Sequence, residues 1–238
     1  MSTSHFLYKK SYAINDNIKI CIPKVGQVID NEDDYYDIVY SITSMPIDFM
    51  VQLDDLGIDF TEISAWDLFL LLFNGIKEKD RIYLDLVFDG LDLSRFEIQE
   101  IDNEIVIRDE IQNITIDKRT HAHMASVLRK IHHIEQNRRR PANVEAKEYM
   151  IRRAREKMKR RKNRKYDSNL ESLIIAMVNT EQFKYDFEQT RNLSIYQFNE
   201  SVQQVIKKIE YDNRMYGVYA GTIDPKELRQ EDLNWLIH

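Results

Sequence analysis

The sequence predicts an α+β protein: an N-terminal mixed α/β domain followed by a mostly α-helical C-terminal region, with a basic helical arm between them. Three observations lead to this prediction. Apolar residues alternate with polar ones in several stretches before residue 118, and after it they recur at the 3.6-residue period of a helix. Only six Gly and four Pro occur in 238 residues, which favours helices with short connections. Residues 137–165 contain fourteen Lys and Arg but only three Glu.

We therefore predict three regions: an acidic α+β domain at 1–118, a helix plus the basic helical arm or linker at 119–165, and a helical C-terminal module at 166–238. The first region contains 24 acidic and 10 basic side chains, whereas the whole chain has a net charge of −6. Charge divided in this way says more about binding partners than about the fold.

Turn-forming residues between alternating stretches predict two hairpins in the N-terminal region. Asn15-Asp16-Asn17 has the composition of one turn, and Asp102-Asn103 has that of the other. We expect the first hairpin, or two short strands, within residues 11–29. The remaining predicted strands are 82–88, 96–101, 104–108 and 114–116.

Three helices are predicted between these strands, each from the residues at its start. Asp33-Asp34 would place negative charge at the positive end of a helix dipole, and Pro46 suits a first helical position. Ser64 and Asp67 form a variant capping box before the apolar run Leu68–Phe73, which Asn74-Gly75 would end. Because this third helix is apolar all round, we expect it at the centre of the N-terminal core.

Beyond Asp117, apolar residues at helical spacing predict a helix that reaches Ile134 and is interrupted by Arg138–Arg140. Pro141 is predicted to start the basic helix. The apolar stripe of this helix is narrow, because only every fourth residue belongs to it. We expect residues 159–165 to be frayed or a linker. Capping boxes then predict two more helices, and a short one follows. The first capping box consists of Ser168 and Glu171, and the second of Ser194 and Gln197. The short helix is predicted to begin at Asp224-Pro225.

The basic arm, residues 137–165, is the strongest charge signal in the chain. Its side chains could neutralise nucleic-acid phosphates, but the segment has no single-strand platform, zinc finger or RNA-recognition motif. A solvated helix face and docking onto an acidic protein surface, including this chain's own N-terminal part, remain alternatives. The candidate electrostatic residues are Arg138, Arg139, Arg140, Arg152, Arg153, Arg155, Lys159, Arg160 and Arg161.

Apolar and aromatic ridges in the C-terminal module predict either simple core packing or a groove for a partner's helix. The candidate partner-binding residues are Phe198, Val202, Val205, Ile209, Tyr216, Tyr219 and Trp235.

Residue patterns favour neither an enzyme nor a cofactor protein. No phosphate-binding glycine loop, nucleophile elbow or Cys/His nucleophile arrangement occurs, so we expect no enzymatic activity. Four histidines at 121–133 and two acidic groups, Asp54-Asp55 and Asp85 with Asp89 and Asp92, are weak metal candidates; we predict no metal site. The single Cys21 indicates a reducing compartment, and the longest apolar run is too short to span a membrane.

Segment 193–236 resembles the C-terminal end of tail assembly chaperone proteins of tailed bacteriophages. The resemblance rests on the helix start Ser194–Phe198, the turn Tyr216–Gly221 and the closing segment Asp232–Leu236. Segments 45–75 and 130–151 are similar to uncharacterised proteins from phage or prophage tail-gene regions. The acidic N-terminal domain and the basic arm depart from the chaperone pattern.

The resemblance implies a non-enzymatic morphogenesis factor in the cytoplasm of the bacterial host that binds the tape measure protein before the tail tube polymerises. Two alternatives stay open. One is a nucleic-acid-binding phage protein that acts through 137–165. The other is a structural or regulatory phage protein, such as a virion component whose opposite charges drive self-association.

Overall fold

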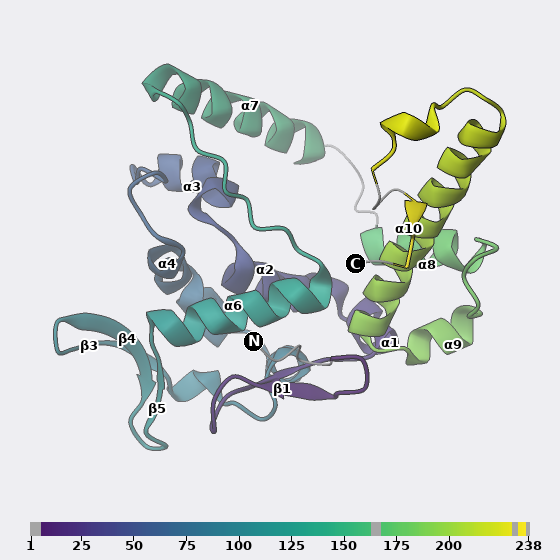
Figure 1. Cartoon of the computed structure of the whole chain (residues 1–238). Coiled ribbons are helices and arrows are strands. Elements are labelled where there is room, and N and C mark those ends of the chain that lie inside the picture. Colours follow the sequence, from purple (N-terminus) through teal and green to yellow (C-terminus); the bar gives the residue numbers. More distant parts are fainter. Residues whose placement is uncertain (1–5, 163–167, 230–232, 237–238) are drawn as a thin grey trace.

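The computed structural model describes residues 6–162, 168–229 and 233–236. It confirms the α+β class: two small antiparallel sheets lie in the N-terminal half, and helices make up the rest (Figure 1). The first sheet consists of β1 (Ser11–Ala13) and β2 (Lys19–Cys21), with Tyr12 opposite Ile20. The second has the order β3-β4-β5, formed by Glu97–Ile101, Glu104–Asp109 and Ile114–Ile116.

Both predicted hairpins are present, and their turns have the expected chemistry. Asn15 accepts backbone hydrogen bonds from Asn17 and Ile18 through its side-chain oxygen. Asp102 and Asn103 both adopt positive φ angles, 52° and 64°, which Asn and Asp tolerate better than most residues. The first hairpin is shorter than the predicted range, since α1 (Val25–Ile29) begins two residues after Pro23.

The N-terminal helices are α2 (Glu32–Thr43), a 3-10 turn at Pro46–Phe49 continued by α3 (Met50–Asp55), α4 (Ala65–Lys77) and α5 (Arg81–Val87). Ser64 and Asp67 form the predicted capping box of α4. This helix continues two residues past Gly75, where the sequence predicted its end. It also exposes Leu71, so it packs through one face against the core and is not buried all round.

The prediction of a strand at 82–88 is wrong, because this segment forms α5. Leu84, Val87 and Phe88 are buried at helical spacing, whereas Ile82 is exposed. Only Phe88 pairs with a strand, through an isolated bridge to Ile20 of β2. A short apolar run does not distinguish a strand from a helix, and here the helical spacing of the buried residues decided the outcome.

In the part of the chain that the structure describes, five α-helices follow the second sheet: α6 (Lys118–His132), α7 (Val144–Lys162), α8 (Asn169–Val178), α9 (Phe187–Asn192) and α10 (Ile195–Tyr219). The helix α6 ends at His133, whose φ of 52° is left-handed, and not at the predicted Arg138. Pro141 does not start α7 as predicted. Asn143 starts it, accepting a hydrogen bond from the backbone of Ala146.

Three further predictions about helix ends need correction. Residues 159–162 belong to α7, and 163–165 lie outside the described residues. Gly217 does not end α10, which continues to Tyr219. The N-cap Ser168 accepts from the backbone of Glu171, and Glu32 accepts from the backbone N–H of Leu170, so Glu32 supports the start of α8 where the sequence predicted a capping box with Glu171. A 3-10 turn at Pro225–Glu227 follows, as predicted.

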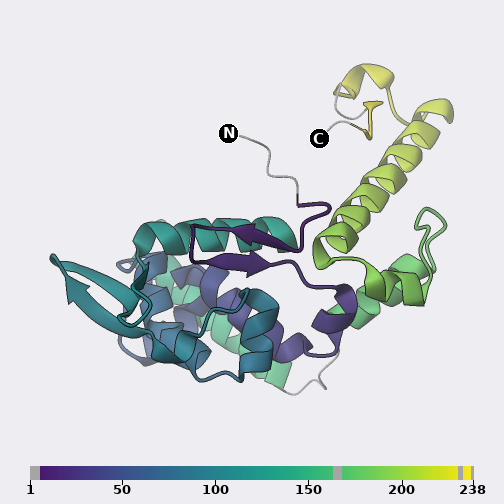
Figure 2. The same cartoon turned by 90° about the horizontal axis from the view of Figure 1, so that it is seen from below.

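One hydrophobic core joins the two halves of the chain. It extends from Phe6 and the first hairpin through α2 and α6 to Leu170 of α8 and Phe198 of α10. A smaller cluster of Ile47, Leu53, Phe60 and Leu68 lies between α3 and α4. Seen from below, the second half of α10 leaves this body and extends outward (Figure 2).

Candidate functional site

Residues spaced three and four apart form one face of α10, which is covered by the core at the start of the helix and uncovered at the end. This face, called the α10 stripe here, consists of Phe198, Val202, Val205, Ile209, Asp212, Tyr216 and Tyr219.

The exposure of the α10 stripe rises steadily along the helix. Phe198 is fully buried, Val205 is 8 % exposed, and Ile209 is 36 % exposed. Tyr216 and Tyr219 are 77 % and 83 % exposed. Apart from Asp212, which pairs with Lys208, the pattern therefore continues beyond the point where the described chain supplies packing partners, as expected of a helix face that meets another helix.

The structure separates the predicted partner-binding residues into two groups. Phe198, Val202 and Val205 belong to the hydrophobic core, and the Phe198 ring lies 6.1 Å from that of Phe183 in an edge-to-face arrangement. These three side chains contact their own chain and offer no surface to a partner. The accessible candidates on the stripe are thus Ile209, Tyr216 and Tyr219.

Trp235, the remaining candidate, contacts α10 beside the stripe. Its backbone carbonyl accepts a hydrogen bond of 3.2 Å from Gln204 Nε2, and the Nζ of Lys208 lies 5.6 Å from its ring. Lys208 also pairs with Asp212 of the stripe, so Trp235 lies along one edge of its exposed half, and Tyr216 and Tyr219 remain exposed.

The basic arm docks on the acidic N-terminal part of the same chain, one of the alternatives considered from sequence. Met150 and Ile151 of α7 pack against the cluster between α3 and α4. Lys147 pairs with Asp59 at 2.6 Å, and Arg155 reaches Asp54 and Asp55 at 2.8 and 2.7 Å. Hydrogen bonds from Lys147 and Thr61 lower the pKa of Asp59 to about 2.

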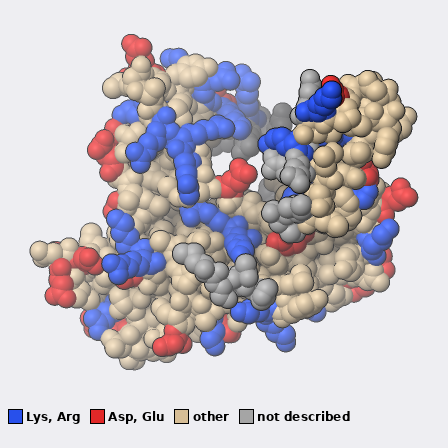
Figure 3. All heavy atoms as spheres, viewed as in Figure 1, with Lys and Arg blue, Asp and Glu red and all other residues tan. Residues whose placement is uncertain are grey.

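The outward side of α7 keeps its positive charge. Arg152 and Arg153 lie over the ring of Tyr149 at 5.6 and 5.9 Å, and Lys159 and Arg160 are exposed. None of these four forms an ion pair with the described part of the chain. The side chain of Arg161 lies outside the described residues. The space-filling view shows Lys and Arg gathered over α7 and the loop before it (Figure 3).

Arg138, Arg139 and Arg140 line a groove of about 860 Å³ between this loop and the segment 45–63. Asn137 anchors the loop by donating to Asp48 at 2.8 Å, and Arg138 Nε donates to Gln136. Apolar side chains such as Phe60 and Val144 share the lining. The groove combines apolar walls with three adjacent guanidinium groups, an arrangement suited to an acidic segment with apolar side chains.

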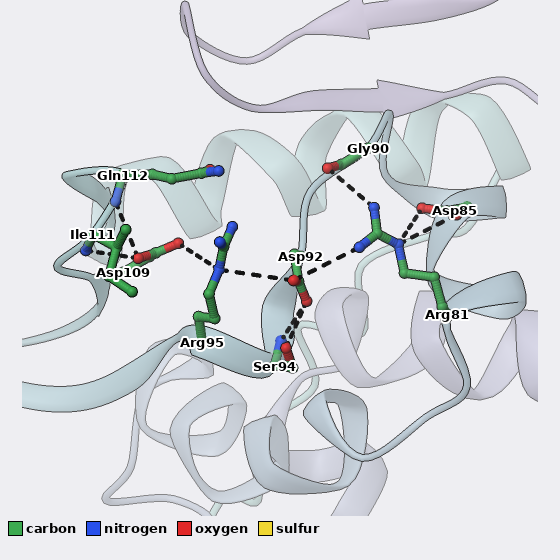
Figure 4. Close-up of polar contacts among 9 residues, drawn as sticks. All are labelled: Arg81, Asp85, Gly90, Asp92, Ser94, Arg95, Asp109, Ile111 and Gln112. Carbon is green, nitrogen blue, oxygen red and sulfur yellow. Dashed lines mark hydrogen bonds and ion pairs between the residues drawn. The ribbon is translucent and has the colours of Figure 1, made fainter.

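Carboxylates from both acidic groups that were considered for metal binding form ion pairs with arginines. Asp92 lies between Arg81 and Arg95, each at 3.7 Å, and Arg95 continues to the buried Asp109 at 3.3 Å (Figure 4). The Ser94 hydroxyl, assisted by the two guanidinium groups, lowers the pKa of Asp92. Asp85 pairs with Arg81 at 3.1 Å. This chain of charges fixes the second sheet to α5 and has a structural role.

The histidines in α6 and at its C-terminal end contact different residues. His121 Nε2 donates to the carbonyl of Ile42 at 3.0 Å, and burial lowers the pKa of this imidazole to about 4. His132 contacts the hydroxyl of Tyr35 at 2.9 Å, and burial, with His133 nearby, lowers its pKa to about 3. Within the described ranges, no group of three His, Cys, Asp or Glu residues is placed to hold a metal ion.

The sequence did not predict one cluster of side chains. Acidic and aromatic side chains in the first turns of α2 face α8 across a hollow. Asp33-Asp34 were interpreted only as a helix-start signal. Their proximity to residues 169–173 could not be read from a chain in which the two segments lie far apart.

Comparison with known proteins gives one match. Residues 159–238 are similar to the YomV second domain, a phage-associated domain family, and this segment includes α8, α9 and α10. No curated protein and no solved structure matches the chain. No helix in the described part of the chain has the length and apolar character needed to cross a membrane. The C-terminal third of the chain is thus similar to a phage-associated domain family.

Proposed function

We propose that this chain is a non-enzymatic phage tail morphogenesis factor that acts as an assembly chaperone. Its ligand is an amphipathic helical segment of the tape measure protein, bound by the exposed half of the α10 stripe. The similarity of 159–238 to a phage-associated domain family supports a phage role, and the resemblance of 193–236 to tail assembly chaperones supports the choice of partner.

The observation that carries this proposal is the change in exposure along the stripe. Ile209, Tyr216 and Tyr219 continue the spacing of the buried residues Val202 and Val205, yet the described chain covers Ile209 only in part and leaves both tyrosines largely exposed. Tyrosine provides a large apolar contact area with few rotatable bonds, and it is enriched at the centres of protein interfaces. A helix laid along this face would continue the packing that α6 and α1 provide nearer the start of α10.

The groove beside Arg138–Arg140 adds an electrostatic component to the proposal. A tape measure segment with acidic residues would be attracted to this groove and to the outward face of α7. Exposed charge of this kind mainly increases the rate of association and is screened by salt. The stripe would therefore determine how long the complex lasts, and the arm how fast it forms.

The experiment uses the purified full chain and the tape measure protein of the phage that encodes it. The double variant Tyr216→Asp/Tyr219→Asp should lose binding in calorimetry by at least about tenfold, since one or two buried aromatic anchors contribute roughly 2–4 kcal/mol. The matched control is Tyr8→Asp, because Tyr8 is 88 % exposed and lies outside α10.

Nucleic-acid binding is the second candidate, and the unpaired outward charges of α7 favour it. Arg152, Arg153, Lys159 and Arg160 lie within three turns on one helix and could follow a phosphate backbone. Affinity for duplex or single-stranded DNA should then fall by roughly three to five decades between 50 and 200 mM salt if six to ten phosphates are contacted. Unmeasurable binding at 50 mM salt would eliminate this candidate.

A further inference from the structure

The β3–β4 hairpin, residues 97–109, projects from the body of the molecule and keeps apolar side chains exposed. Both cartoon views show its turn extending beyond the helices (Figure 1, Figure 2). Ile98 lies opposite Ile107 and Glu100 opposite Ile105, so these four side chains share one face of the hairpin. Ile107 is buried in the core, whereas Ile98 and Ile105 are 42 % and 49 % exposed. The described chain thus leaves two neighbouring isoleucines partly uncovered.

The turn end of the same hairpin is acidic. Glu100, Asp102 and Glu104 are exposed. None of these three carboxylates forms an ion pair within the part of the chain that the structure describes. At the other end of β3, by contrast, Glu97 pairs with Lys77 at 2.5 Å. The projecting end therefore combines exposed apolar side chains with negative charge that this chain does not neutralise.

The groove beside Arg138–Arg140 has the opposite charge. Four basic and two acidic side chains line its volume of about 860 Å³. Lys147 and Asp59 neutralise each other at 2.6 Å, which leaves the three arginines against Glu62. The last two arginines are exposed, and neither forms an ion pair within the described ranges. The groove thus has an excess of positive charge.

The floor of the groove is apolar. Ile47 and Phe60 are each 5 % exposed and belong to the cluster between α3 and α4. Pro141 and Val144 also line it, and Val144 is 65 % exposed. Low-dielectric walls focus the field of the charges beside them, so a carboxylate here is attracted more strongly than on an open surface. The groove can therefore contact an isoleucine and a carboxylate of one segment together.

We propose that the β3–β4 hairpin of a second copy of this chain docks in the groove beside Arg138–Arg140. Ile98 and Ile105 contact the apolar floor, and the carboxylates near the turn pair with the guanidinium groups, whose parallel N–H donors match a carboxylate. A second copy is the occupant because the hairpin and the groove are complementary in charge and both have apolar surface. No residue of the hairpin lines the groove of its own chain, so the contact joins two copies.

This contact is small and sensitive to salt. The end of a two-stranded hairpin offers a narrow surface, so we expect the low end of the range of interface sizes, below about 1,200 Å² in total. Exposed charges provide much of the attraction, and the Debye length falls from about 10 Å at 0.1 M salt to about 3 Å at 1 M. Association should therefore be reversible, favoured by low salt and lost at high salt.

The association is independent of the α10 stripe. Each copy has one hairpin and one groove on different surfaces, so two copies can form a closed pair and more copies an open chain. No residue of α10 belongs to the hairpin or lines the groove. Both arrangements leave Tyr216 and Tyr219 accessible, so self-association goes beyond the proposed function and does not rest on it.

Sedimentation velocity of the full chain at about 200 µM tests the proposal with two charge-reversal variants. Glu100→Lys/Glu104→Lys changes the hairpin and Arg139→Glu/Arg140→Glu changes the groove, and all four side chains are exposed. At about 0.1 M salt, the wild type should sediment as a dimer or a larger species. Each variant alone should sediment as a monomer, with a dissociation constant at least about tenfold higher, since like charges then face each other.

A mixture of the two variants provides the most specific result. The groove variant keeps a native hairpin and the hairpin variant keeps a native groove, so their pair retains an intact contact. The mixture should sediment as a heterodimer although each variant alone is monomeric. Because a misfolded variant could not restore association, this result also shows that both variants are folded.

The matched control is Asp16→Lys/Glu181→Lys, which reverses two exposed carboxylates outside the hairpin and changes the net charge equally. It should associate as the wild type does. A monomeric wild type under these conditions would overturn the proposal, and so would a mixture that stays monomeric. Equal loss of association in the control would also overturn it, because general attraction between charged surfaces would then explain the result.

The outcome can be distinguished from failure of the proposed function. That function is tested by Tyr216→Asp/Tyr219→Asp, which leaves the hairpin and the groove unchanged. This double variant should therefore associate with itself as the wild type does, whatever its affinity for the tape measure protein. Loss of self-association in it would place the contact on α10 and overturn the proposal.

Discussion

The carboxylate of Glu32 accepts a hydrogen bond of 3.1 Å from the backbone N–H of Leu170, a residue 138 positions further along the chain. The same carboxylate accepts from the hydroxyl of Ser168, the N-cap of α8. One side chain at the start of α2 thus accepts two hydrogen bonds from the first residues of α8. The C-terminal helices are held to the N-terminal part by these polar contacts as well as by the shared core.

Replacing Glu32 by Ala should lower the free energy of unfolding by about 1–3 kcal/mol, the cost of leaving a partly buried hydrogen-bonding group without its charged partner. Chemical denaturation at pH 7 measures this change. Glu156→Ala, which removes an exposed carboxylate of α7, is the control and should cost much less. Equal effects of the two variants would contradict a specific role for Glu32.

Stability should fall in mild acid because two histidines are buried in the neutral form. The folded-state pKa is about 4 for His121 and about 3 for His132, against 6.5 in the unfolded chain. The unfolded state therefore binds more protons below pH 6.5, and the stability present above that pH is lost as pH falls toward 4. Each histidine contributes about 1.4 kcal/mol per pH unit in this window.

The variant His121→Gln should keep a donor to the carbonyl of Ile42 and remove the contribution of His121 to this slope. Urea denaturation at pH 7.5 and 5.0 gives the comparison. The matched control is His123→Gln, which replaces an exposed histidine two residues along α6. A wild-type stability that is flat between these pH values would show that the histidines are not held neutral.

The docking of α7 should depend on its inward ion pairs. In the double variant Lys147→Ala/Arg155→Ala, amide hydrogen exchange should accelerate within α7 and remain unchanged in α2 and α6. The control Arg152→Ala/Arg153→Ala removes two charges from the outward face and should leave α7 protected. Protection that is insensitive to the inward pairs would assign the docking of α7 to Met150 and Ile151 alone.

Cys21 should react slowly with thiol reagents. Burial, together with the nearby Asp89 and Asp85, raises the pKa of this thiol to about 11, so almost no thiolate exists at pH 7.5. Colorimetric thiol titration should show a large increase in rate when the chain is unfolded in guanidinium chloride. Fast labelling of the folded chain at pH 7.5 would contradict this arrangement.

Local signals predicted the elements well where the chemistry of a turn or cap is contained within four residues. Asn15 supports its own hairpin turn, and Ser64 and Ser194 form capping boxes with the residues three positions later. The strand predicted at 82–88 failed because a seven-residue apolar stretch satisfies both periods. Tertiary packing of Leu84, Val87 and Phe88 selected the helix.

The candidate surfaces were only partly predictable. Helical spacing identified the α10 stripe, but it could not show where along the stripe the core ends. That boundary depends on how far α6 and α1 reach, so Phe198 and Tyr216 looked equivalent in sequence. The acidic partner of α7 was one of several alternatives, and only the folded chain shows Arg155 against Asp54 and Asp55.

The most direct test of the account is the affinity of the full chain for the tape measure protein, measured by calorimetry with and without Tyr216→Asp/Tyr219→Asp. We expect tight binding by the wild type and by Tyr8→Asp, and at least a tenfold loss in the double variant, with unchanged circular dichroism. Equal affinity of all three proteins would contradict the assignment of the α10 stripe as the binding face. Absence of binding even by the wild type would contradict the proposed function itself.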